Sequence, residues 1–174
     1  MLVFTDGACL NNGRPNSKAG WAFVVDHPNI VIKDRLELRG PYGDLGVQSS
    51  NRAELRAVIA ALQYRAWGEE GFRTLVIATD SEYVVKGATA WIYTWLENGW
   101  RTANSEAVKN KDMWTKLMKA TLHLRDQGTS THFWRIPRDL NTVADAGAKA
   151  AAEAYDIAEW TKRRVLSFGP RSSA

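Results

Sequence analysis

The sequence lacks the features of secreted and membrane proteins. It has a single cysteine, Cys9, among 174 residues, which excludes a disulfide within the chain and is typical of a reducing compartment. No apolar run approaches the ~18 residues that span a bilayer, and the N-terminus lacks the basic region and cleavage site of a signal peptide. We therefore expect an intracellular protein, nuclear or cytoplasmic, that does not bind membranes.

Internal repeats and Pro/Gly-rich linkers are also missing from most of the chain. Hydrophobic residues make up 45% and charged residues 24%, as in an ordinary globular protein, and the length is that of one domain. The last dozen residues combine basic side chains with Gly169, Pro170 and serines. We expect a single domain over residues 1–161 and a basic, flexible tail over residues 162–174.

The net charge of +4 is distributed unevenly. From Trp160 onward the chain holds four basic and no acidic side chains, so the remainder is close to neutral and is no general polycation. The segment from Lys86 to Lys119 has a net charge of +3 and contains four tryptophans. Solvated helices often carry such lysines, but this segment and the tail are the candidate surfaces for nucleic acid, and deleting the tail is expected to weaken binding and its salt dependence.

Hydrophobic periodicity predicts an α/β domain with one mixed sheet. Alternating or β-branched stretches predict strands, and a near-continuous apolar run over residues 75–79 predicts a strand buried on both faces. Helices are predicted where apolar residues recur with helical spacing. The predicted strands are 2–6, 20–25, 30–38, 75–79 and 132–136; the predicted helices begin at Ser49–Asn51 and cover 82–87, 89–97, 110–126 and 143–161.

Four carboxylates lie in short motifs at the ends of predicted strands or the starts of predicted helices. Two follow predicted strands and two lie at predicted helix starts: Asp6 in Thr5-Asp6-Gly7, Glu54 in Asn51-Arg52-Ala53-Glu54, Asp80 in Thr79-Asp80-Ser81, and Asp145 in Ala144-Asp145. Carboxylates brought together by a fold need a cation to stay ionised. Oxygen-only ligation suits Mg²⁺ or Mn²⁺, and a pair of such ions can hydrolyse phosphodiesters.

Each carboxylate also has an ordinary structural interpretation. Asp80 can cap a helix, Asp6 can belong to a turn, and Asp145 can complement a helix dipole. Glu54 is harder to explain in this way, because it lies at the border of the buried stripe of its helix and a buried carboxylate needs a partner. The four signals are weak singly and informative in their joint order.

In that order and approximate spacing, the four motifs resemble those of type 1 ribonuclease H. The stretch 89–100, with Trp91, Trp95 and Trp100, resembles the handle region that grips the DNA strand in this family, and 110–112 resembles the start of the next helix. The likeness covers roughly residues 2–155. It implies a ribonuclease H-like fold, a five-stranded mixed sheet with its first three strands antiparallel and flanked by helices, and hydrolysis of the RNA strand of RNA/DNA hybrids.

The resemblance also implies the site residues. Asp6, Glu54, Asp80 and Asp145 would be catalytic and hold two Mg²⁺ ions, with Mn²⁺ expected to substitute, giving 5′-phosphate and 3′-hydroxyl ends. The implied RNA-strand contacts are Cys9, Asn11, Asn12, Ser50 and Asn51, and the implied DNA-strand contacts are Ser49, Trp91, Trp95, Trp100 and Asn110. Core packing remains the alternative for Trp95. The implied partner is the hybrid alone, bound by a monomer without an obligate protein partner.

The sequence departs from the family pattern in three places. Many members carry a histidine in a loop before the final helix, but residues 136–141 are shortened and lack it, which suggests a subgroup without that loop; Arg138 or Asp139 is a candidate replacement. His27, His123 and His132 are expected to be structural. A basic residue often found two positions before Ser49 is here Val47, and the chain begins on its first strand, so no N-terminal hybrid-binding domain is expected.

Three other functions remain open at this point. The first is a catalytically weak or silent hybrid-binding module, although a binder gains nothing from carboxylates that repel phosphate. The second is another enzyme of the same broad fold, such as a DNA exonuclease, a transposase core or a sugar-kinase-like ATPase. The aromatic and basic handle region disfavours the exonuclease, and the chain is too short for the second lobe that the ATPase needs. The third is a domain derived from a reverse transcriptase polyprotein.

Overall fold

The computed structural model describes residues 1–26 and 30–161, so His27 and the basic tail lie outside the described residues. No helix in this part of the chain is both long and apolar enough to cross a membrane. The elements, in chain order, are β1 (Leu2–Leu10), β2 (Lys18–Val25), β3 (Ile30–Arg35), α1 (Ser50–Gln63), β4 (Thr74–Thr79), α2 (Glu82–Lys86), a π-helical turn (Gly87–Trp91), α3 (Ile92–Glu97), α4 (Lys111–Asp126), β5 (Ser130–Arg135), a 3-10 turn (Arg138–Leu140) and α5 (Thr142–Ala152).

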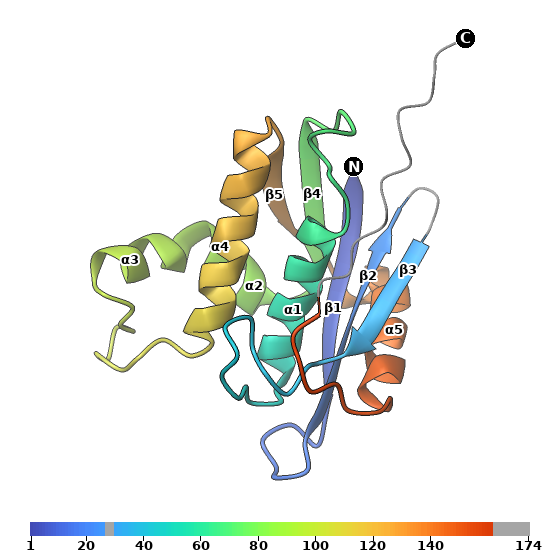
Figure 1. Cartoon of the computed structure of the whole chain (residues 1–174), viewed down its shortest axis with the longest axis vertical. Helices are drawn as coiled ribbons and strands as arrows, with labels where there is room; N and C mark the ends of the chain where they lie inside the picture. Colours follow the sequence, from blue (N-terminus) through green and yellow to red (C-terminus); the bar gives the residue numbers. More distant parts are fainter. Residues whose placement is uncertain (27–29, 162–174) are drawn as a thin grey trace.

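The strands form one five-stranded sheet in the order β3-β2-β1-β4-β5. The pairs β1–β2 and β2–β3 are antiparallel, whereas β1–β4 and β4–β5 are parallel. Helices α1 and α4 cover one face of the sheet, and α5 packs on the other face against β1, β2 and β3 (Figure 1). The predicted fold class, a mixed sheet with its first three strands antiparallel and flanked by helices, is confirmed.

Two glycines allow helices to approach the central strands closely. A Cβ at Gly7 would overlap the backbone of α1 at Ala53 and Glu54, and a Cβ at Gly20 would overlap the backbone of α5 near Ala148. Only glycine permits such contact between backbones. The close approach on both faces brings side chains from α1 and α5 to the same central strands.

Helix α1 forms at the place that its sequence indicates. The Ser49 hydroxyl accepts a hydrogen bond from the Arg52 backbone N–H at 3.3 Å, which satisfies one of the free donors of the first turn. Leu55, Val58 and Ile59 then face the core and are fully buried. Burying such side chains contributes about 1.5–3 kcal/mol each, so core packing holds α1 against β1.

The final helix ends earlier than the sequence predicts. Helix α5 stops at Ala152, not at residue 161, and residues 153–161 form a non-helical segment that we call the C-terminal strap. The backbone N–H groups of Leu38 and Arg39 donate to carbonyls of the strap at 2.8 and 3.0 Å, and Asp156 pairs with the buried Arg35 at 3.0 Å. Alanines favour a helix in this sequence, but these contacts with the chain after β3 outweigh that preference.

The strap closes over a buried ion pair. Arg56 Nη2 and Glu37 Oε1 lie 2.6 Å apart, and both side chains are almost completely buried. The guanidinium carbon of Arg56 lies between two indole rings, 4.5 Å from the centroid of Trp21 and 4.1 Å from that of Trp160. The Thr161 backbone and hydroxyl donate to Glu37 Oε1, so the strap completes the hydrogen bonding of this carboxylate.

We predict that Glu37→Ala destabilises the protein strongly, because it leaves the Arg56 guanidinium buried without its anion. Breaking such a pair costs about 3–5 kcal/mol. Urea unfolding at pH 7 measures this loss in the free energy of unfolding. The matched control is Glu159→Ala, whose partner Arg39 and whose own side chain are both exposed, and it is expected to change stability by less than about 0.5 kcal/mol. Equal losses in the two variants would contradict this prediction.

Candidate active site

Two of the four candidate carboxylates lie side by side at the centre of the sheet. The parallel pairing of β1 with β4 ends at Phe4 and Ala78; Asp6 lies two residues further along β1, and Asp80 directly follows the end of β4 at Thr79. The carboxyl groups of Asp6 and Asp80 are close enough to share a side-chain hydrogen bond. The sequence predicts that β1 ends at Asp6, which is wrong: Asp6 lies in the middle of β1, opposite Ala22 of β2. Strand β1 continues because β2 keeps pairing with it to Leu10, while the pairing with β4 stops at Phe4.

Helices from both faces of the sheet add the other two carboxylates. Glu54 lies on α1 where Gly7 allows the helix to touch β1, and Asp145 lies in the first turn of α5. The charges of Asp80 and Asp145 act on Asp6, and those of Asp6 and Asp80 act on Glu54. The structure therefore brings all four predicted carboxylates together at one place on the sheet.

The crowding of negative charge shifts the acidity of this group. Burial, followed by the charges of Asp80 and Asp145, raises the pKa of Asp6 to about 7. Burial and the neighbouring aspartates also raise the pKa of Glu54 well above its ordinary value. Burial works in the same direction on Asp145, but hydrogen bonds from Lys149 and Arg138 outweigh it, and the pKa of Asp145 is lowered.

Three side chains from the last part of the chain contact these carboxylates. Asn141 is buried at the start of α5, and its amide nitrogen donates to Asp80 Oδ1 at 2.8 Å and to the Thr5 carbonyl at 3.0 Å. Arg138 Nη2 donates to Asp145 Oδ1 at 2.9 Å, and Lys149 Nζ donates to Asp145 Oδ2 at 2.6 Å. Of the two candidate replacements in the shortened stretch, Arg138 lies at the carboxylates; Asp139 is exposed.

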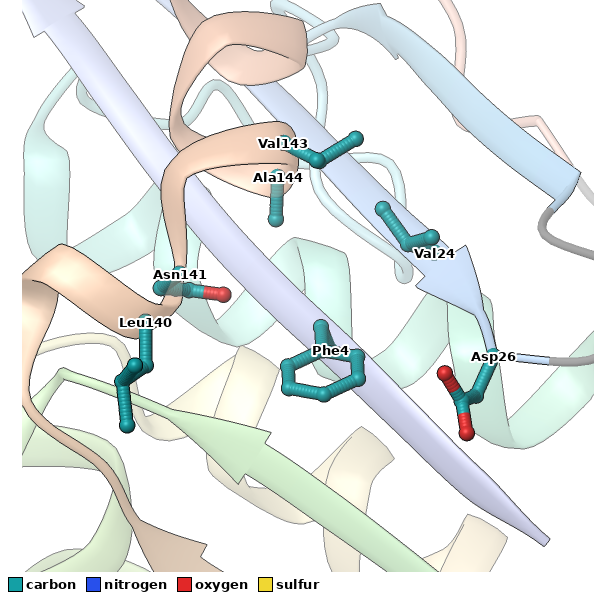
Figure 2. A pocket seen from close by; sticks show the side chains of 7 residues that line it. All are labelled: Phe4, Val24, Asp26, Leu140, Asn141, Val143 and Ala144. Carbon is teal, nitrogen blue, oxygen red and sulfur yellow. The ribbon is translucent and has the colours of Figure 1, made fainter.

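A shallow apolar pocket lies beside this group, on the face of the sheet covered by α5. It is lined by Phe4, Val24, Asp26, Leu140, Asn141, Val143 and Ala144. Asn141 extends from the start of α5 toward the side of the pocket where Phe4 lies (Figure 2). None of the four carboxylates lines the pocket. Asn141 connects the two, because it lines the pocket and its amide nitrogen donates a hydrogen bond to Asp80.

The four carboxylates, in the positions that the structure gives them, do not form a complete set of metal ligands. Among the described residues, no three acidic, histidine or cysteine side chains are spaced to hold a metal ion as they stand. The donor chemistry nevertheless fits a hard cation: all four side chains offer carboxylate oxygens, and the buried Glu54 Oε2 finds no hydrogen-bond partner in the described part of the chain.

The predicted handle is an aromatic cluster built on α4. Trp95 packs against Trp91, Trp100 and Trp114, with ring centroids 5.5 to 6.2 Å apart. Trp91 keeps 38% of its surface exposed, but Trp95 keeps 9%, so the alternative of core packing is the correct one for Trp95. Trp95 packs against Trp91 and Trp100 from the protein interior and exposes little surface to a ligand. Sequence periodicity could not distinguish these roles, because positions 91 and 95 share one helical face.

Ser49 and Asn110 are brought together by a residue that the sequence analysis did not select. Arg52 forms a bidentate pair with Asp112 at 2.6 and 2.9 Å, and its Nη1 reaches Asn110 Oδ1 at 3.4 Å. The backbone of Arg52 donates to the Ser49 hydroxyl. Asn110 itself adopts a left-handed conformation with φ of 57° before α4. The sequence held a signal for this contact, because Arg52 is part of the Asn51-Arg52-Ala53-Glu54 motif and Asp112 follows Asn110 by two residues.

The candidate RNA contacts gather around the first turn of α1. Asn12 and Ser50 are joined by two hydrogen bonds of 3.3 Å, one from the Asn12 amide and one from the Ser50 backbone. Cys9 donates weakly to the Gln48 carbonyl at 3.6 Å. Asn11 and Asn51, which are next in sequence to Asn12 and Ser50, are exposed. The β1–β2 loop is thus joined to the first turn of α1 through Asn12 and Ser50.

Comparisons with known proteins place the chain in one family. The family described as RNase H matches residues 1–153 of this chain. A Ribonuclease H of Treponema pallidum subsp. pallidum is 42% identical over 123 residues, covering 67% of this chain and 70% of that protein. A Ribonuclease H of Jannaschia sp. is 38% identical over 155 residues, covering 86% of this chain and 89% of that protein.

A solved structure shows the same fold. LC11-RNase H1, determined in complex with an RNA/DNA hybrid, has a TM-score of 0.55 and is 20% identical, covering 87% of this chain and 96% of that chain. At this level of identity the likeness concerns the fold alone. Together with the family match over most of the chain and the two named relatives, the finding leads to one conclusion: this chain belongs to the ribonuclease H family of enzymes.

Proposed function

We propose that this protein hydrolyses the RNA strand of RNA/DNA hybrids, and that Asp6, Glu54, Asp80 and Asp145 hold two Mg²⁺ ions for this reaction, with Mn²⁺ able to replace them. The observation that carries the proposal is the convergence of four carboxylates from β1, β4, α1 and α5 at one place. A buried, unpartnered oxygen of Glu54 and a pKa of about 7 at Asp6 support it, because such a group is stable only with a proton or a cation. The related LC11-RNase H1 was solved with a hybrid.

The chain's own residues have distinct roles in this proposal. Asp6, Glu54, Asp80 and Asp145 would hold Mg²⁺, which would supply an activated water nucleophile and stabilisation of negative charge on the departing oxygen, so that the ends formed would be 5′-phosphate and 3′-hydroxyl. Asp6 and Asp80 are fixed by the sheet, and Asn141 orients Asp80 through its 2.8 Å hydrogen bond. Glu54 is presented by α1 where Gly7 allows contact. Catalysis is assigned to the domain of residues 1–161.

Substrate choice is assigned to the two flanking surfaces. The surface formed by Cys9, Asn11, Asn12, Ser50 and Asn51 would read the 2′-hydroxyl groups of the RNA strand in the shallow minor groove. Trp91 and Trp100 would pack against deoxyribose of the DNA strand, which has no hydroxyl group to desolvate. Ser49 and Asn110, joined by Arg52, would contact a DNA phosphate.

The test of this function is cleavage of a labelled RNA/DNA hybrid beside RNA/RNA and DNA/DNA duplexes, in Mg²⁺, by the wild type and Asp80→Asn. We expect cleavage of the hybrid's RNA strand only, and a loss of at least a thousandfold in the variant, because a neutral amide is a poor ligand for Mg²⁺. Tight hybrid binding without cleavage by the wild type would overturn the proposal in favour of a binding module.

The acidity of Asp6 gives a prediction for stability. Its folded pKa of about 7 exceeds its ordinary value of 3.8, so the native state holds a proton that the unfolded chain releases. Without metal, stability therefore falls as pH rises from about 4 to about 7. Asp6→Asn removes this penalty and is expected to stabilise the metal-free protein at pH 8 by on the order of 2–4 kcal/mol, with a smaller gain at pH 5.

Urea unfolding in EDTA at the two pH values measures this difference. Excess Mg²⁺ is expected to stabilise the wild type much more than Asp6→Asn, because only the wild type retains the full set of anions. An Asp6→Asn variant that is no more stable than the wild type at pH 8 would contradict the raised pKa.

The exposed part of the aromatic cluster gives a further prediction. Trp91→Ala is expected to weaken hybrid binding roughly tenfold, since loss of an aromatic platform for a nucleotide costs about 1–3 kcal/mol. Trp134→Ala is the matched control, because Trp134 is 53% exposed but lies on β5 outside the cluster. Fluorescence anisotropy in EDTA, where cleavage is absent, measures both affinities. Equal affinities for the two variants would remove Trp91 from the DNA contacts.

A further inference from the structure

Both oxygens of the Asp145 carboxylate are engaged by cations of the same chain. Arg138 donates to Oδ1 and Lys149 to Oδ2, at 2.9 and 2.6 Å. Asp145 is one of the four proposed metal ligands, yet neither of its oxygens is free to ligate without losing one of these partners. A divalent cation must therefore compete with them for the same atoms.

Arg138 is the more important of the two competitors. Its Nε also lies 4.0 Å from Asp80 Oδ2, so its guanidinium faces two of the four carboxylates, whereas Lys149 pairs with Asp145 alone along the surface of α5. In the described part of the chain, no other lysine or arginine pairs with two of these four groups. The charge of Arg138 also acts on Asp6 and Glu54, favouring their ionised forms. It thus acts as a counter-cation for the whole group.

The position of Arg138 also allows it to leave. Its side chain is 72% exposed and donates one hydrogen bond among the described residues, to Asp145. The guanidinium therefore already lies largely in water, whereas the side chain of its partner Asp145 is only 18% exposed, so moving Arg138 away from Asp145 changes the hydration of Arg138 little. A doubly charged ion near the same carboxylates would repel it with about twice the force that a single charge would exert.

We propose that Arg138 is the internal counter-cation of the carboxylate group, that a divalent cation must displace it from Asp145, and that it thereby sets the metal concentration at which the site fills. This inference rests on the proposed function, which makes Asp145 a metal ligand.

The test is calorimetric titration of the full chain with Mg²⁺ alone, for the wild type, Arg138→Gln and Arg135→Gln. Removing a unit charge a few ångströms from a divalent ion is expected to lower the dissociation constant of Arg138→Gln roughly tenfold. Arg135→Gln is the matched control: it removes the same charge three residues away, where Arg135 pairs with Glu82 at 3.3 Å. Screening by 0.15 M salt should keep its change below about twofold.

Thermal unfolding supplies a second readout that does not depend on activity. At equal Mg²⁺ concentration below saturation, the rise in Tm on adding metal should be larger for Arg138→Gln than for the wild type, because stabilisation follows the ratio of metal concentration to dissociation constant. A dissociation constant for Arg138→Gln that is unchanged within twofold, or higher than that of the wild type, would overturn the proposal; a higher value would mean that Arg138 organises the site for metal.

Asp145→Asn separates a failure of this inference from a failure of the proposed function. Weaker Mg²⁺ binding by Asp145→Asn, together with unchanged binding by Arg138→Gln, overturns the role of Arg138 and leaves the metal assignment intact. Wild-type Mg²⁺ binding by Asp145→Asn contradicts the ligand assignment itself, and with it the competition at that carboxylate.

Discussion

The mutual repulsion of four carboxylates is the constraint on which the arrangement of this protein depends. The backbone pairing of β1 and β4 brings Asp6, on β1, close to Asp80, which directly follows β4. Close contact of α1 at Gly7 and of α5 at Gly20 then holds the two helices that carry Glu54 and Asp145 against the same strands. The packing of the hydrophobic core forces together groups that would separate in water, and cations or protons must compensate.

Several compensating groups can be identified. A proton is retained at Asp6 up to a pH of about 7, Arg138 and Lys149 neutralise Asp145, and Asn141 donates to Asp80. A metal ion would have to replace some of these partners at the carboxylate oxygens, because those oxygens are already engaged. Metal binding, proton release and movement of Arg138 are therefore linked equilibria, and each affects the stability of the domain as well as its chemistry.

The extent to which the sequence predicted these features follows from the range of the interactions. The mixed sheet and the four carboxylates could be predicted from the sequence, because apolar periodicity and short motifs are local signals. The strap was not predictable: residues 153–161 have a helical composition, and their non-helical path depends on Leu38, Arg39 and the Glu37–Arg56 pair, which are distant in sequence. The burial of Trp95 and the bridging role of Arg52 likewise depend on α4, which the local pattern does not specify.

The central claim, that the four carboxylates behave as one charged group which a divalent cation completes, is tested most directly by NMR titration of the aspartate and glutamate side-chain carboxyl carbons. Without metal, the Asp6 signal should titrate near pH 7, and with saturating Mg²⁺ this titration should move to markedly lower pH. Titration of Asp6 near pH 4 in both conditions would show that the carboxylates do not interact in this way.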